Sequence, residues 1–183
     1  MTKTKAKGAR PPFIIASGDI PEETDRYPGS DEALAPSRPI GIKAGLRRIG
    51  LHLCRVPPGV RTSWPHAEQN EEEFVYVIAG EVDCWVDGEL HRMRAGDLAA
   101  FPCGTGISHV FLNDGPEEAT LLVGGEAGKR DSKIFYPLHP DRERNVPWSA
   151  WWHDIPKRPL GPHDGLPAAQ RRQKRPPVTS RKK

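Results

Sequence analysis

The sequence has no long apolar run and only three cysteines among its 183 residues. A membrane helix needs about 20 consecutive apolar residues, and the apolar run in the basic N-terminal stretch is only "FIIA", which is too short for a signal peptide. No CxxC pair is present. Cys54 and Cys84 fall in apolar segments, where a thiol packs as a small hydrophobe, while Cys103 lies in a turn. We therefore predict a cytoplasmic protein without a membrane segment.

Sustained helical periodicity is also missing. The chain contains 18 glycines and 20 prolines, and its apolar residues occur in short segments bounded by turn residues. Asp87-Gly88 separates two alternating segments by two residues, which predicts a tight β-hairpin. The predicted strands are 51–56, 73–80, 81–86, 89–93, 96–101, 108–113, 119–126 and 133–136. Many short strands with tight turns indicate an all-β sandwich or barrel.

Composition divides the chain into four parts. Residues 1–40 are predicted to be an extended N-terminal arm, 41–137 the β-barrel, 138–167 a proline- and tryptophan-rich extension packed on the barrel, and 168–183 a basic, disordered tail. The tryptophans of "PWSAWWHD" could stack on a ligand, but burial as anchors is the favoured interpretation. The net charge of +3 arises at the two ends. Nucleic-acid binding is disfavoured because no aromatic residues that could stack on bases are interleaved with the basic residues of the tail. The positive charge of the tail keeps such binding as an alternative.

Histidine and acidic side chains share faces of neighbouring strands. His66 and Glu68 are two residues apart and point the same way in an extended segment. Glu73 shares its face with Val75, which places a carboxylate toward an apolar interior, where it is costly unless it is paired or bound to a cation. The neighbouring acids of "QNEE" can remain in water. Farther along, His109 is predicted to share a face with Phe111 and Asn113.

These residues fall into two motifs that resemble those of the cupin superfamily. The first reads G-x5-H-x-H-x(3,4)-E-x6-G, and is matched by Gly59, His66, Glu73 and Gly80, with one extra residue after Gly59 and Glu68 in place of the second histidine. The second reads G-x5-P-x-G-x2-H-x3-N, and is matched by Gly96, Pro102, Gly104, His109 and Asn113, with a "TG" insertion before the histidine.

The resemblance implies a double-stranded β-helix, or jelly roll, in which His66, Glu73 and His109 ligate a divalent metal ion. Glu68 is either a fourth ligand or a solvent-facing carboxylate. Two imidazoles with carboxylates suit Mn, Fe, Ni or Zn. The alternative is a metal-free barrel whose polar groups bond to one another. The predicted lining of the pocket is Val75, Phe111 and Asn113.

The sequence thus predicts a metal-binding cupin that acts on or binds a small molecule in the barrel. A metal-dependent enzyme of oxygenase, isomerase or lyase type is one reading, and no residue selects among these reactions or identifies a catalytic group. A non-catalytic ligand-binding or regulatory module is the alternative. A homodimer is also predicted, since such barrels associate through strands and arms.

Overall fold

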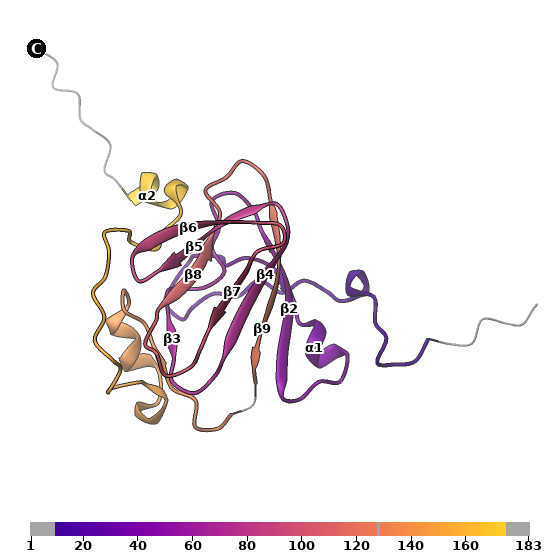
Figure 1. Cartoon of the computed structure of the whole chain (residues 1–183), viewed down its shortest axis with the longest axis horizontal. Helices are drawn as coiled ribbons and strands as arrows, with labels where there is room; N and C mark the ends of the chain where they lie inside the picture. The colour runs from indigo at the N-terminus through magenta and orange to yellow at the C-terminus, as the bar shows by residue number, and fades with distance from the viewer. Residues whose placement is uncertain (1–9, 128, 175–183) are drawn as a thin grey trace, which may run out of the picture.

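The computed structural model describes residues 10–127 and 129–174. A five-stranded antiparallel sheet, in the order β1-β2-β9-β4-β7, lies beside a three-stranded sheet in the order β6-β5-β8, and β3 pairs with β10 (Figure 1). The all-β prediction is confirmed. The strands are β1 (Ser37–Arg38), β2 (Ile49–Val56), β3 (Ala67–Glu68), β4 (Glu73–Ala79), β5 (Glu81–Val86), β6 (Glu89–Arg94), β7 (Leu98–Phe101), β8 (His109–Leu112), β9 (Ala119–Glu126) and β10 (Ile134–Phe135).

The core lies between the two sheets and follows the period of two that the sequence shows. In β4, Val75 and Val77 are buried, whereas the side chain of Tyr76 between them is 40% exposed. Cys54 and Cys84 belong to the same buried cluster, which confirms that both thiols pack as small hydrophobes. Alternation along each strand therefore decides which side chains can face a site inside the barrel.

Two turns have the backbone that their residues predict. Asp87 and Gly88 have φ angles of 47° and 96° between β5 and β6, as a two-residue hairpin turn requires. Gly80, the last glycine of the first motif, has φ of 75°, and a Cβ atom there would lie 2.7 Å from the carbonyl oxygen of Glu118. Both positions favour glycine for steric reasons.

The N-terminal arm is joined to the barrel more closely than an extended arm implies. Strand β1 pairs with β2, and the short helix α1 (Ile40–Lys43) lies beside β2 (Figure 1). The five-stranded sheet thus begins before the predicted boundary at residue 41. A short 3-10 turn, η1 (Ser17–Asp19), precedes it.

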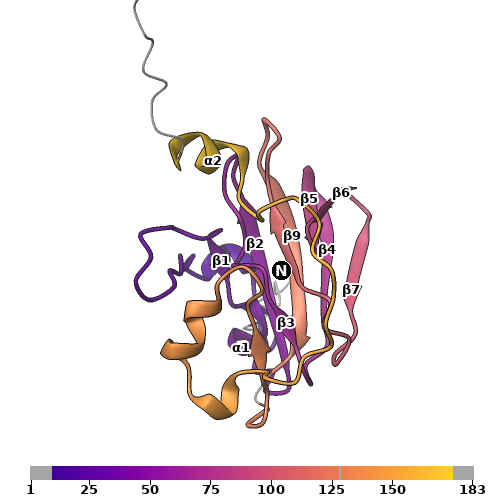
Figure 2. The same cartoon turned by 90° about the vertical axis from the view of Figure 1, so that its left-hand side faces the viewer.

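The C-terminal extension packs on the barrel through two of its three tryptophans. Trp151 and Trp152 are 4% and 3% exposed, as anchors should be, but Trp148 is 75% exposed. The extension contains the 3-10 turns η2 (Pro140–Asn145) and η3 (Trp148–Ala150). Figure 2 shows η2 and the N-terminal arm on the same side of the strands, and the Arg142 guanidinium lies 4.9 Å from the centre of the Tyr27 ring.

The predicted disordered tail is corrected over its first seven residues, which form helix α2 (Ala168–Lys174). The backbone N–H of Ala168 donates to a carboxylate oxygen of Asp114, so the start of the helix is tied to the loop after β8. The rest of the tail, residues 175–183, lies outside the described residues. In the described part of the chain, no helix has the length and apolar character that crossing a bilayer requires.

Candidate metal centre

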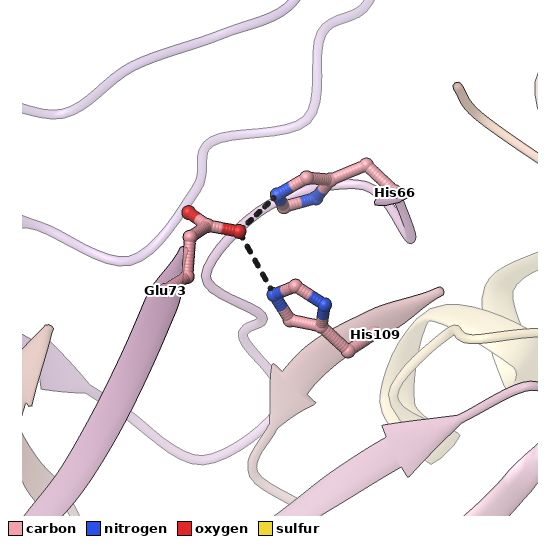
Figure 3. Close-up of side chains that lie close together, drawn as sticks. All are labelled: His66, Glu73 and His109. Carbon is pink, nitrogen blue, oxygen red and sulfur yellow. Dashed lines mark ion pairs between the residues drawn. The ribbon is translucent and has the colours of Figure 1, made fainter. Parts of the chain in front are cut away.

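Backbone pairing brings the two motif histidines together. His66 precedes β3 and His109 opens β8, and the two residues exchange backbone hydrogen bonds of 3.2 and 2.9 Å. Glu73 is the first residue of β4 and reaches toward both imidazole rings (Figure 3). One ligand atom from each of the three side chains lies within 4.8 Å of the other two. Residues from three segments therefore meet at one point inside the barrel.

The distances in this cluster suit a shared cation. Oε2 of Glu73 lies 3.5 Å from Nε2 of His66 and 3.2 Å from Nε2 of His109. Two ligand atoms that hold one ion at about 2.0 Å in tetrahedral geometry lie about 3.3 Å apart. Neither contact has hydrogen-bond geometry, so Oε2 of Glu73 is buried without a hydrogen-bond partner among the described residues. An ion would satisfy this oxygen.

The surroundings hold both imidazole rings in orientation. Nδ1 of His66 donates to the carbonyl oxygen of Trp64 at 2.8 Å, so Nε2, which faces Glu73, is the nitrogen that can bind an ion when the ring is neutral. Such a bond to the second ring nitrogen is a common partner of a metal-ligating histidine. The His109 ring is stacked on Phe101, with centroids 3.5 Å apart and planes 5° apart. The residues present fit a divalent ion with three protein ligands.

The electrostatics of the metal-free cluster show the same need for positive charge. Burial opposes ionisation of Glu73, but contacts with His109 and His66 outweigh it and hold the pKa of this carboxyl well below its usual range. Burial also disfavours the charged form of His66, yet Glu73 raises the pKa of this imidazole to about 9. Burial is the main reason that the pKa of His109 is lowered. In the metal-free protein, the proton on His66 thus supplies the positive charge that a metal cation would supply beside Glu73.

Glu68 lies beside this cluster but not within it. The three ligand atoms that lie within 4.8 Å of one another do not include one from Glu68. Its Oε2 accepts a hydrogen bond of 3.2 Å from the Ser132 hydroxyl. Burial and the charges of Glu73 and Glu71 raise the pKa of the Glu68 carboxyl to about 7, although His66 acts in the opposite direction. Glu68 remains a predicted fourth ligand that would have to turn away from Ser132.

A cavity of about 190 Å³ opens beside the three side chains. Val75 and Phe111 are among the residues that line it. Asn113 does not line it: its side-chain amide is completely buried and donates to the carbonyl oxygens of Val56 and Glu117, so it braces the loop after β8. The second motif's asparagine is thus structural here.

Sequence reasoning missed the residues that complete the cavity from the N-terminal arm. Leu34, Ala35, Ser37 and Asp25 all line it. The arm has no strand periodicity or motif that would have placed these residues at a site. Cys54 also lines the cavity; burial raises the pKa of its thiol to about 12, so it is not a thiolate nucleophile at neutral pH.

Comparison with known proteins identifies the family. The profile of the Cupin domain family matches residues 52–125. The crystal structure of a sugar phosphate isomerase of the cupin superfamily from Silicibacter pomeroyi superposes with a TM-score of 0.62 and 31% sequence identity, covering 67% of this chain and 80% of that chain. The chain belongs to the cupin superfamily. The jelly-roll fold implied by the two motifs is therefore confirmed.

Two curated cupin-like relatives come from Streptomyces. Protein SchB of Streptomyces halstedii is 33% identical over 109 residues, which cover 60% of this chain and 73% of that protein. Polyketide synthase CurC of Streptomyces cyaneus is 35% identical over 106 residues, which cover 57% of this chain and 64% of that protein. The chain thus spans slightly less than two thirds of the length of CurC.

Proposed function

We propose that this cupin is a metal-dependent enzyme of isomerase or lyase type that acts on a small molecule in the cavity. His66, Glu73 and His109 hold the divalent ion, and Glu68 is the proposed fourth ligand. The observation that carries the proposal is the convergence of three ligand atoms within 4.8 Å at the wall of a cavity. Mn, Fe, Ni and Zn all accept this donor set.

The ion, when bound, supplies a Lewis acid that polarises an oxygen atom of the substrate. The chain's own residues position and shield the reacting groups. The Trp64 carbonyl holds the His66 ring, and Phe101 holds the His109 ring. Val75 and Phe111 give the cavity apolar walls. His66, Glu73 and His109 leave coordination positions open, which Glu68 and the substrate can occupy.

We prefer an isomerase or lyase to an oxygenase because both reactions require a proton to be moved. Glu68, when it is not bound to the ion, offers a carboxylate near His66 for that step. The Silicibacter pomeroyi neighbour is named a sugar phosphate isomerase, which supports the choice. A non-catalytic ligand-binding module is the second candidate. It is favoured by the modest size of the cavity, about 190 Å³, which lies below the roughly 300 to 1,000 Å³ of common ligand pockets.

The test begins with metal content. Protein purified without chelator and then loaded with zinc should hold one ion per chain by elemental analysis, and the Glu73→Gln variant should hold far less. Glu72→Gln is the matched control, because Glu72 is an exposed neighbour outside the cluster. No ion in the wild type at stoichiometric loading would contradict the proposed centre.

The second step separates the two candidate functions. Zinc-loaded protein is incubated in D₂O with hydroxyacetone or 2-hydroxyacetophenone, and exchange of the hydrogens next to the carbonyl is followed by NMR. An enzyme that moves such protons should accelerate the exchange over the Glu73→Gln variant. A protein that holds zinc but never exceeds that variant would support the non-catalytic module. Oxygen consumption by iron-loaded protein would instead indicate an oxygenase.

We also propose that the protein is a homodimer. Across the outer face of the larger sheet, Leu53, Leu122, Tyr76 and Leu98 lie directly opposite one another on adjacent strands. Tyr76 and Leu98 are 40% and 61% exposed. The other sheet is covered by the chain itself, where the Trp85 indole donates to the carbonyl oxygen of His163. An exposed apolar row is typical of a protein contact surface. The reduced cytoplasm is retained as the proposed location because all three cysteines are free.

A further inference from the structure

Part of the lining of the cavity beside the candidate metal centre comes from the N-terminal arm, which precedes the residues that the Cupin domain profile matches. The family profile begins at residue 52. Leu34, Ala35, Ser37 and Asp25 of the N-terminal arm line the same cavity as His66. Residues of the N-terminal arm and the three candidate ligands of the barrel thus line one cavity.

Several contacts hold the N-terminal arm against the barrel. The guanidinium of Arg61 is 1% exposed and forms two hydrogen bonds, of 2.7 and 2.6 Å, with the Glu32 carboxylate. The backbone N–H of Ala35 donates to the carbonyl oxygen of Arg61 at 2.9 Å. Tyr27 is stacked on Trp64 with ring centroids 4.2 Å apart. These contacts hold the N-terminal arm against the barrel, where it forms part of the cavity wall.

The charges around the cavity are unsuited to an anion. Its lining contains the carboxylates of Asp25 and Glu73, but neither lysine nor arginine. Among the described residues, no cationic side chain is paired with Asp25, and Arg61 behind the arm is committed to Glu32 and to the carbonyl oxygen of Gly165. Phosphate sites in proteins use arginine, lysine or several N–H donors. A phosphate dianion here would be repelled by the half-buried carboxylate of Glu73 and by the carboxylate of Asp25, which is exposed.

Even a bound divalent ion does not reverse this balance. Two positive charges on the ion are matched by the negative charges of Glu73 and Asp25, because both coordinating imidazoles are neutral, and Glu68 as a fourth ligand would add one more negative charge. The rest of the lining consists of apolar side chains such as Leu34 and Val75, hydroxyl groups such as that of Thr62, the Cys54 thiol and the exposed imidazole of His52. Such a cavity recognises apolar surface together with one or two oxygen atoms.

We propose that the N-terminal arm makes this site selective for uncharged, partly apolar organic molecules, and that Asp25 excludes phosphorylated ones. The inference rests on the proposed function for the location of the site, and it gives the substrate class. This preference for uncharged molecules distinguishes the chain from the Silicibacter pomeroyi protein named sugar phosphate isomerase, with which it shares the fold.

The experiment uses two probes that share one ring system, 2-naphthol and 2-naphthyl phosphate. Their binding to the full-length chain is measured by equilibrium dialysis at neutral pH. The wild type should bind 2-naphthol at least about tenfold more tightly than the phosphate. Asp25→Lys should reduce this preference by about tenfold or more, because it replaces a repelling charge with an attracting one.

Asp19→Lys is the matched control. It makes the same change of charge on the same arm, at an exposed residue that does not line the cavity, and it should leave the preference unchanged. Equal or tighter binding of the phosphate by the wild type would overturn the inference. So would failure to bind either probe, or an equal effect of the two lysine substitutions.

The same measurements distinguish this inference from the proposed metal centre. Both probes are tested with zinc-loaded protein and with protein treated with a chelator, and the zinc content of each sample is determined. A preference for 2-naphthol in a protein that never holds zinc would support the selective cavity and contradict the metal centre. Stoichiometric zinc with a preference for the phosphate would support the metal centre and contradict the role of Asp25.

Discussion

The Glu32→Ala substitution tests the link that holds the arm against the barrel. It removes the two carboxylate oxygens of Glu32 that accept hydrogen bonds from the buried Arg61 guanidinium. It also removes the acceptor of the Trp64 indole N–H, which lies 3.0 Å from Glu32. Loss of one partner of a buried ion pair costs about 3 to 5 kcal/mol. The Glu32 side chain is 15% exposed, and Arg61 keeps its bond to the Gly165 carbonyl. We therefore expect the lower end, about 3 kcal/mol of unfolding free energy.

The assay is chemical and thermal unfolding. A loss of about 3 kcal/mol corresponds to a fall in Tm of roughly 6 to 12 °C for a domain of this size. Asp141→Ala is the control, because its ion pair with Arg144 joins side chains that are 85% and 84% exposed, and surface pairs contribute little. A Glu32→Ala variant as stable as the Asp141→Ala variant would refute the reasoning.

The pH dependence of this link has a defined sign. Burial alone would raise the pKa of the Glu32 carboxyl, but the bonds and charge of Arg61 outweigh it and lower the pKa. The stabilisation is therefore fully present above the ordinary value of 4.5 and is lost as the pH falls through the lowered value. Below that point the difference in stability between wild type and Glu32→Ala should shrink.

Three other predictions concern the metal centre and the dimer. His66→Ala should weaken zinc retention by more than about 100-fold and Glu68→Ala by less, on the order of tenfold; unchanged retention in Glu68→Ala would place that carboxylate in solvent. His66 must lose its proton to bind an ion, and its pKa in the metal-free protein is raised from the ordinary value of 6.5 to about 9. Zinc affinity should therefore rise by about tenfold per pH unit between pH 6.5 and pH 9. Zinc affinity that does not change with pH in competition titrations would contradict His66 as a ligand. Leu98→Lys, in the exposed apolar row, should convert dimer to monomer in sedimentation experiments without lowering Tm, whereas Leu90→Lys, at a 37% exposed residue on the other sheet, should not.

The ligand residues could be predicted because the evidence for them is local. Spacing within each motif identifies His66, Glu73 and His109, and the period of two places Glu73 and Val75 on one face of β4. The Asp87-Gly88 turn is also a local property, since it depends on the φ angles of two residues. Strand existence, the core face and the candidate metal ligands were therefore readable from the sequence.

Contacts between distant segments were decided only by the tertiary structure. Arg61 and Glu32 are 29 residues apart in the sequence, and no sequence pattern in either segment predicts that they pair. Trp148 and Trp151 stand in one short, proline-rich stretch, yet one is exposed and the other buried, because only the path of the chain across the barrel determines which ring meets the core. The sequence by itself determined the barrel and the three candidate ligands, whereas packing of the arm determined the part of the cavity lining that includes Asp25. Periodicity encodes the face of an element, but not which remote segment will cover it.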